Sequence, residues 1–537
     1  MGTPSRIQME AFPKRIRLRT VWLNGEVIGG ANEATAGEKG LTGQAWDTLV
    51  RRHRVIIAQG NCVKNLGTQE KGYKKGRMFV VWRFAFLVFL GGIWGGLAVG
   101  HANAKPVAVP LSERPDQMAP APAASSTKDT PREERALQQT TDQYRLTRER
   151  YEKAVAYSRA GYTLYFVYVV WGFVALYLLL RLRFVAKLRD FAEAQSGRRV
   201  VQAVIFVPGL LLALALLHLP IHMYWHKLSL RYEQSVQGWG SWFWDWTKGE
   251  LIGTGLGVGA ALLLSTVIRW RPRTWWLYFW FAAVPLALFL FFISPWFLDP
   301  VFNKFLPLME RHPELAESIG KLTQRAGVPV PTQRMFLMEA SKKTNEINAY
   351  VTGIGASKRV VVWDTTIQKM SPDEVLVVVG HELGHYALGH VVKGFALFLG
   401  GLLIGLYVAY RALQWVLGRW GQQWGVRGQE DWAALAVLLL IMSVMEFVGT
   451  PIGSSFSRAQ EHAADVYGLE VTHGTVPNSQ EVAAHAFQVM GELDLADPNP
   501  SPFITFWLYS HPPLAERLKF AHDYDPWSKG EGPKYVK

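Results

Sequence analysis

Residues 371–385 read SPDEVLVVVGHELGH, and this stretch decides how the rest of the chain is interpreted. A serine N-cap followed by proline and two acids predicts a helix start. The apolar run continues into HELGH, so we expect His381, Glu382 and His385 on that helix. Residues four apart lie on one helical face, which lets both imidazoles converge on one Zn²⁺ while Glu382 takes a proton from water beside the ion. The pattern predicts one zinc ion per chain.

Gly384 lies inside this predicted helix, where glycine costs roughly 1 kcal/mol relative to alanine. Such a glycine usually has a packing reason. Gly384 therefore argues against a solvated helix that carries exposed His and Glu only for solubility.

A third ligand has to come from elsewhere, because a catalytic zinc site combines three protein ligands with an open position. In the segment SRAQEHAAD, Glu461 and Asp465 share a helical face. Glu461 can complete the ligand set, and Asp465 can accept the far N–H of a ligand histidine. His462 is a rival ligand. His390 follows His385 by five residues, about 140° around a continuous helix, so we expect a residue of the membrane interface and not a ligand.

Residues 348–366 predict a β-hairpin with a glycine-containing turn. An edge strand beside the metal can bind a polypeptide through backbone pairing, although an ordinary structural hairpin has the same pattern. Near the C-terminus, His511 begins the run HPPLAER, and an imidazole or cation there can stabilise an oxyanion.

Apolar blocks of about 20 residues predict a membrane protein. Six spans are expected, at about 162–180, 200–221, 251–268, 275–297, 393–416 and 433–453. Basic residues gather in the loops at 181–199, 269–274 and 417–432, and positive loops favour the cytoplasm. This places the HELGH region on the opposite side of the membrane.

The N-terminal region has a different character. Residues 78–104 combine a basic start, an apolar run and an Ala102-Asn103-Ala104 ending, which is typical of a secretory signal peptide. We interpret Met78 as the natural start and residues 1–77 as a non-native extension, the alternative being a disordered extension before an anchor helix. Residues 105–135 are rich in Pro, Ala and Ser and predict a disordered linker.

The net charge of +14 does not indicate nucleic-acid binding, because the basic residues are scattered, with many in residues 1–77 and most others flanking apolar blocks. Cys62 is the only cysteine, which excludes an intrachain disulfide and a cysteine-ligated metal site. The expected partners are a polypeptide substrate, from the HELGH motif, and membrane lipids, from the apolar blocks.

Together, the segments SRAGY, SPWFLDPVFNKFLPL, INAYVTG, VVVWDT, HELGH, SRAQEHAAD and SHPPLAERL resemble the type-I CAAX prenyl endopeptidases and, more distantly, the HtpX-like membrane proteases. The resemblance spans about residues 150–518. It implies a mainly α, polytopic membrane protein whose helices form a barrel around a chamber, with a zincin-type metallopeptidase domain that carries the small hairpin.

The resemblance also implies roles for individual residues. The metal ligands are His381, His385 and Glu461, with Glu382 as base and Asp465 supporting a ligand. The substrate strand lies at Asn348, followed by Ala349 and Tyr350, and both His511 and Arg517 lie near the reacting carbonyl.

We expect membrane domains at 136–297, with four spans, and at 393–453, with two. The metallopeptidase domain is expected in two parts, 298–392 and 454–525, before a flexible tail at 526–537. The signal peptide suggests a bacterial inner membrane with the site facing the periplasm, and substrates that include membrane or lipid-linked polypeptides. The rival interpretation is a chamber that binds or transports lipid-linked peptides around a structural zinc. Substitution of Glu382 discriminates the two, because a structural site needs no base.

Overall fold

The computed structural model describes residues 22–23, 26–27, 144–353 and 355–536. The signal peptide and linker expected at 78–104 and 105–135 lie outside these residues, as does most of 1–77. The chain divides into a unit at 1–70 and a unit at 71–537. In the first unit, strand β1 (Trp22–Leu23) pairs antiparallel with β2 (Glu26–Val27).

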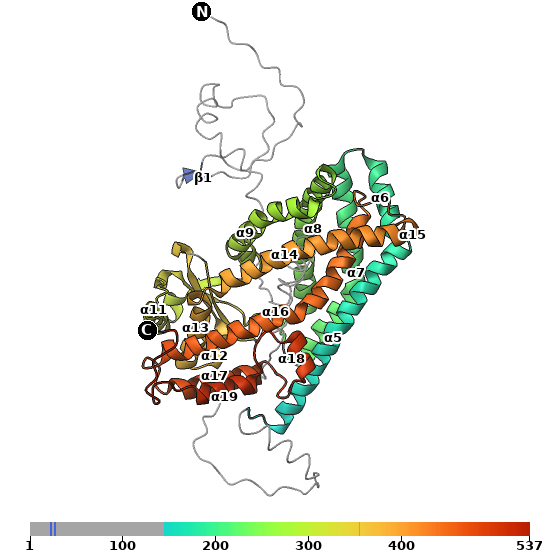
Figure 1. Cartoon of the computed structure of the whole chain (residues 1–537). Helices are drawn as coiled ribbons and strands as arrows, with labels where there is room; N and C mark the ends of the chain where they lie inside the picture. Colours follow the sequence, from blue (N-terminus) through green and yellow to red (C-terminus); the bar gives the residue numbers. More distant parts are fainter. Residues whose placement is uncertain (1–21, 24–25, 28–143, 354, 537) are drawn as a thin grey trace, which may run out of the picture. The chain divides into compact units, whose positions relative to one another are not determined.

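Long helices dominate the second unit (Figure 1). They are α5 (Arg148–Arg181), α7 (Arg199–Arg231), α8 (Trp239–Trp270), α9 (Trp275–Phe302), α14 (His390–Val416) and α16 (Ala434–Thr472). Two short helices lie between them, α6 (Phe184–Gln195) and α15 (Gln422–Trp424). Each predicted span falls within one long helix. The helices run past the predicted ends because hydropathy detects only the apolar part of a helix.

Five of these helical stretches in the described residues are long and apolar enough to cross a membrane by length and composition. They are Arg148–Arg181, Arg199–Arg231, Trp239–Trp270, His390–Trp424 and Ala434–Thr472. The sixth predicted span lies in α9, whose apolar part over Trp275–Leu290 is a shorter stretch.

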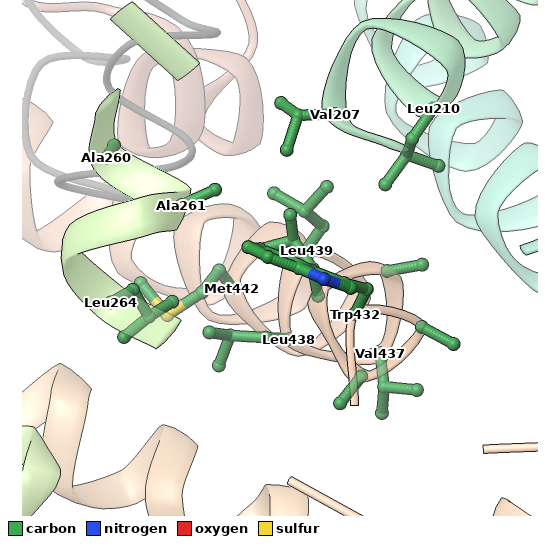
Figure 2. Packing of buried hydrophobic residues seen from close by; sticks show 14 of the residues in the cluster. Val207, Leu210, Ala260, Ala261, Leu264, Trp432, Val437, Leu438, Leu439 and Met442 are labelled. Carbon is green, nitrogen blue, oxygen red and sulfur yellow. The ribbon is translucent and has the colours of Figure 1, made fainter. Parts of the chain in front are cut away.

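Side chains of α7, α8 and α16 meet around Trp432 (Figure 2). The Trp432 ring stacks on Phe206 with centroids 6.1 Å apart, and its Nε1–H donates to Gln202 at 3.0 Å. The Arg199 guanidinium lies 4.1 Å from the centroid of the same ring. Apolar burial drives helices together only weakly within lipid, so close packing and interhelical hydrogen bonds of this kind hold the bundle.

A four-stranded sheet of order β3-β4-β6-β5 lies outside the helical bundle. Its strands are β3 (Phe305–Pro307), β4 (Met335–Met338), β5 (Ala349–Thr352) and β6 (Arg359–Trp363), and only the β4–β6 pair is parallel. The predicted hairpin is confirmed as β5 and β6. Strands β3 and β4 were not predicted, because strands of three and four residues are too short to show a period in the sequence.

Smaller helices complete the part of the chain that holds this sheet. They are α10 (Leu308–Arg311), α11 (Pro313–Arg325), α12 (Asp364–Lys369), α13 (Pro372–Ala387), α17 (Ser479–Leu493), α18 (Pro502–Leu508) and α19 (Leu514–Asp523). Helix α13 packs on both β5 and the C-terminal part of α16.

Helices α13 and α16 cross at glycines. A Cβ added at Gly384 would lie 3.0 Å from Cβ of Tyr467 and 3.2 Å from Cα of Ala464, and one added at Gly468 would lie 3.0 Å from the backbone N of His381. These distances are shorter than ordinary van der Waals contacts. The close approach of α16 is therefore the packing reason for a glycine inside α13.

The final residues were expected to be a flexible tail, but they bind the C-terminal part of α16. The buried carboxylate of Glu470 accepts backbone N–H groups of Tyr535 at 2.7 Å and Val536 at 2.9 Å. It also accepts the hydroxyl of Tyr524 at 2.5 Å. A buried carboxylate is costly unless it is hydrogen-bonded, and this explains why the segment folds back.

Candidate metal centre

Helix α13 has well-defined ends. Ser371 and Glu374 form a capping box, in which the Ser371 side chain accepts from Glu374 N–H and the Glu374 carboxylate accepts from Ser371 N–H. The predicted N-cap is thus confirmed. The helix stops at Gly389, whose φ of 65° lies in the left-handed region that favours glycine. The HELGH residues occupy its last two turns.

Three potential ligand atoms converge from α13 and α16. Nε2 of His381 lies 3.1 Å from Oε2 of Glu461 and 3.1 Å from Nε2 of His385, and the remaining distance, from His385 to Glu461, is 3.5 Å. Glu461 is buried, with 4% of its surface exposed. The structure thus brings together the three residues predicted as ligands from segments about 80 positions apart.

The spacing of these atoms fits a tetrahedral metal site. Metal–ligand bonds of about 2.0–2.1 Å at tetrahedral angles place ligand atoms roughly 3.3 Å apart. Within the described part of the chain, Oε2 of Glu461 has no hydrogen-bond partner of regular geometry, although three imidazoles surround it. A buried carboxylate oxygen in this state needs a cation or protons, and two imidazoles with one carboxylate are a donor set that suits zinc.

Asp465 supports His381 from behind. Its Oδ1 lies 2.8 Å from Nδ1 of His381, which leaves Nε2 of that ring facing Glu461. Burial by itself lowers the pKa of His381, but hydrogen bonds to Asp465 and Glu461 outweigh burial and raise the pKa to about 10. The carboxylate therefore orients the ring and increases the basicity of its nitrogens.

Arg517 holds Asp465 in turn. Its guanidinium donates to Oδ2 at 2.9 Å and to Oδ1 at 2.6 Å, and it stacks over the Phe487 ring at 4.1 Å. Burial lowers the pKa of Arg517, but the charge of Asp465 outweighs this effect and raises the pKa above its ordinary value. Both hydrogen bonds of the guanidinium in the described residues go to Asp465, so Arg517 holds the carboxylate that supports His381.

His511 approaches from the loop after α18. Its Nε2 lies 3.1 Å from Oε2 of Glu461, and its Nδ1 lies 2.9 Å from the hydroxyl of Ser510. The ring is partly accessible, with 28% of the side chain exposed. His511 is not among the residues whose ligand atoms all lie within 4.8 Å of one another. It is therefore placed beside the ligand group on a side that solvent can reach.

Glu382 follows His381 on α13 and is half-buried. Its charge is one of the causes that raise the pKa of Arg517, after the charge and hydrogen bond of Asp465. The Glu382 carboxylate is not one of the three converging donors, but it lies at the same end of α13 as His381 and His385.

Strand β5 lies beside α13, as predicted for a strand near the metal. Asn348 precedes the strand, and its carbonyl accepts from Trp363 N–H at 3.0 Å. Ala349 is buried in the core shared with α13, whereas the Tyr350 side chain packs on the opposite face of the sheet. In the described residues β5 pairs only with β6, so it is an edge strand.

The two remaining histidines lie in different places. The exposed side chain of His462 packs on Phe520, with ring centroids 4.7 Å apart, away from the ligand atoms. His390 is buried, and its Nδ1 lies 3.0 Å from Nδ1 of His385. His390 is not one of the three residues whose ligand atoms converge. The 140° separation from His385 expected for a continuous helix was wrong, because α13 ends before Gly389.

Two family models match the chain next to each other. The model of Peptidase family M48 covers residues 309–525. The model named CAAX prenyl protease N-terminal, five membrane helices, covers residues 132–304. Of that second range, the structure describes residues 144–304, which contain α5, α7, α8 and α9 as long helices.

Whole-chain comparisons agree with the family models. An uncharacterized metalloprotease of Bacillus subtilis, YhfN, is 36% identical over 372 residues, which make up 69% of this chain and 85% of that protein. CAAX prenyl protease 1 of Saccharomyces cerevisiae is 28% identical over 341 residues, covering 60% of this chain and 73% of the yeast protein. The crystal structure of S. mikatae Ste24p matches with a TM-score of 0.62 at 24% identity, covering 72% of this chain and 94% of that one.

The helical bundle and the converging histidines and carboxylate define a membrane metalloendopeptidase. The relatives favour this class over a chamber with a structural metal. The chain belongs to peptidase family M48, and its N-terminal membrane part is of the CAAX prenyl protease type.

Proposed function

We propose that the chain cleaves peptide bonds as a zinc-dependent endopeptidase. His381, His385 and Glu461 would hold the ion, and the observation that carries this assignment is the convergence of their ligand atoms at 3.1, 3.1 and 3.5 Å. A zinc ion bound there would polarise the peptide carbonyl and make water a nucleophile near neutral pH.

Glu382 acts as general base in this proposal. Its half-buried carboxylate lies one residue from His381 and takes the proton of the attacking water, then passes it to the leaving amine. His511 stabilises the negative charge that develops on the carbonyl oxygen, since its Nε2 faces the ligand group from the accessible side. Asp465 and Arg517 act through His381 and do not touch the substrate.

Strand β5 binds the polypeptide in this proposal. Because Asn348 forms a hydrogen-bonded pair with Trp363, the alternation of an antiparallel ladder turns the N–H and C=O of Ala349 and Val351 away from β6. These groups can pair with a substrate strand. The Tyr350 side chain, in contrast, packs against the sheet and would not contact the substrate.

The experiment that tests the reaction replaces Glu382 with Gln. The variant should keep one zinc per chain and lose cleavage of an unmodified test peptide, because the amide cannot take a proton. Glu317→Gln, which makes the same change at an exposed position in α11, is the matched control and should cleave normally. Proteolysis at the normal rate by the Glu382→Gln variant would refute the assignment of the base.

We also propose that the protein lies in a bacterial inner membrane with the site on the periplasmic side. The three basic loops come together: Arg183 in the first donates to the carbonyl of Gln423, and Gln429 donates to the carbonyl of Pro272, each at 2.9 Å. Helices α6 and α15 mark this end of the bundle, away from α13 (Figure 1). A common basic end favours the cytoplasmic side.

Substrates that are membrane-embedded or lipid-linked fit a peptidase domain that continues directly from spanning helices. Comparison of a prenylated and an unprenylated peptide of the same sequence tests this part of the proposal. Equal kcat/KM for the two would exclude a role for the lipid.

A further inference from the structure

His385 and His390 form a pair that the proposed reaction does not use. Their Nδ1 atoms lie 3.0 Å apart, and their ring centroids are 5.1 Å apart with the planes at 73°. His390 is buried, with 5% of its surface exposed. The two rings therefore meet edge to edge through nitrogen atoms, which is the geometry of a hydrogen bond.

Two Nδ1 atoms at this distance share one proton between them. One ring donates its N–H, and the other accepts with a lone pair. Nε2 of His385 faces His381 and Glu461, and an imidazole nitrogen binds a metal only through a lone pair. With a metal ion bound at Nε2, the proton of His385 would sit on Nδ1 and His390 would be the acceptor.

We propose that His390 is a positioning residue for His385, holding its proton on Nδ1 and its ring at the angle that presents Nε2 to the metal. This proposal rests on the proposed metal site. It gives each ligand histidine its own support, a carboxylate for His381 and a neutral imidazole for His385.

The backbone explains how residue 390 reaches residue 385. Helix α13 ends with Leu388 N–H donating to Gly384 O at 2.9 Å and Gly389 N–H donating to Tyr386 O at 3.1 Å. Gly389 takes a φ of 65°, and α14 starts afresh at His390. On a continuous helix the two rings would point about 140° apart. The left-handed glycine turns the chain so that they meet.

Three variants separate the hydrogen bond from the bulk of the ring. His390→Asn keeps an oxygen acceptor at the position of Nδ1. His390→Gln carries its amide one bond further out, at the position of Nε2. His390→Phe keeps a ring of similar size without an acceptor. Only the first can accept from Nδ1–H of His385.

The measurement is the zinc affinity of metal-free protein in detergent, by competition with a chromogenic chelator. The His390→Phe and His390→Gln variants should bind zinc about 10- to 100-fold more weakly than wild type, the usual cost of losing a partner behind a ligand. The His390→Asn variant should keep most of the affinity. Thermal unfolding of the metal-free proteins shows whether each variant folds, and if the His390→Phe variant does not fold, the comparison of His390→Asn with His390→Gln decides.

Each outcome has one meaning. Equal zinc affinity in all four proteins overturns the role of His390, as does a His390→Asn variant that is as weak as the His390→Gln variant. Wild-type protein that binds no zinc overturns the proposed metal site itself, so failure of the two proposals is distinguishable.

Discussion

Gly384 and Tyr467 touch at the crossing of α13 and α16, where a Cβ on residue 384 would lie only 3.0 Å from Cβ of Tyr467. The same crossing brings the HELGH helix and the Glu461 helix together. Any separation of the two helices moves ligand atoms that are now 3.1–3.5 Å apart.

Gly384→Ala should therefore destabilise the protein by about 1–3 kcal/mol through overpacking and weaken zinc binding. Thermal unfolding and zinc content of purified protein measure both effects. Gly400→Ala in α14 is the matched control: a Cβ there meets nothing within 4 Å, so better helix propensity should leave stability equal or raise it by up to about 1 kcal/mol. Similar effects of the two alanines would show that the crossing tolerates a methyl group.

Arg517→Met should destabilise the protein by about 3–5 kcal/mol, since it leaves the buried carboxylate of Asp465 without its countercharge. Chemical denaturation in detergent measures the loss. The free energy of unfolding of the double variant Arg517→Met, Asp465→Asn should fall by less than the sum of the two single losses, because the double variant has no unpaired buried charge. Additive losses would mean that the two side chains contribute independently.

His511→Ala should lower kcat by about 10²- to 10³-fold, the usual effect of removing a group that stabilises an oxyanion. Zinc content should stay at one per chain, because the ligand atoms come from α13 and α16. The His511→Gln variant keeps a hydrogen-bond donor, so its kcat should lie between those of wild type and His511→Ala. The exposed His522→Ala in α19 serves as the control and should be fully active. Loss of zinc from His511→Ala would instead make this residue part of the metal's support.

Most residues of the candidate site could be predicted from local patterns in the sequence. HELGH on a capped helix predicted His381, Glu382 and His385 because a helical period fixes their relative positions. The shared face of Glu461 and Asp465 made them candidates, although only the crossing at Gly384 and Gly468 shows how they reach the histidines. A costly glycine inside a helix was the sequence signal of that crossing.

The features that could not be predicted depend on where the chain turns and on contacts between residues that are far apart in the sequence. His390 was misplaced because Gly389 was not recognised as the left-handed residue that ends α13. The contact between Arg517 and Asp465 was not predicted, because nothing in the segment of Arg517 points to a residue 52 positions away. The tail was expected to be flexible because its partner, Glu470, is also remote in sequence.

The binding of residues 535 and 536 by Glu470 has a consequence for biosynthesis. A ribosome that has just completed α16 has already made His381, His385 and Glu461, yet His511, Arg517 and the segment that caps Glu470 are still to be translated. The set of residues proposed for hydrolysis and for its support is therefore complete only after α19 and the segment beyond it have been made. On the proposed roles of these residues, a nascent chain that has not reached this point should be inactive.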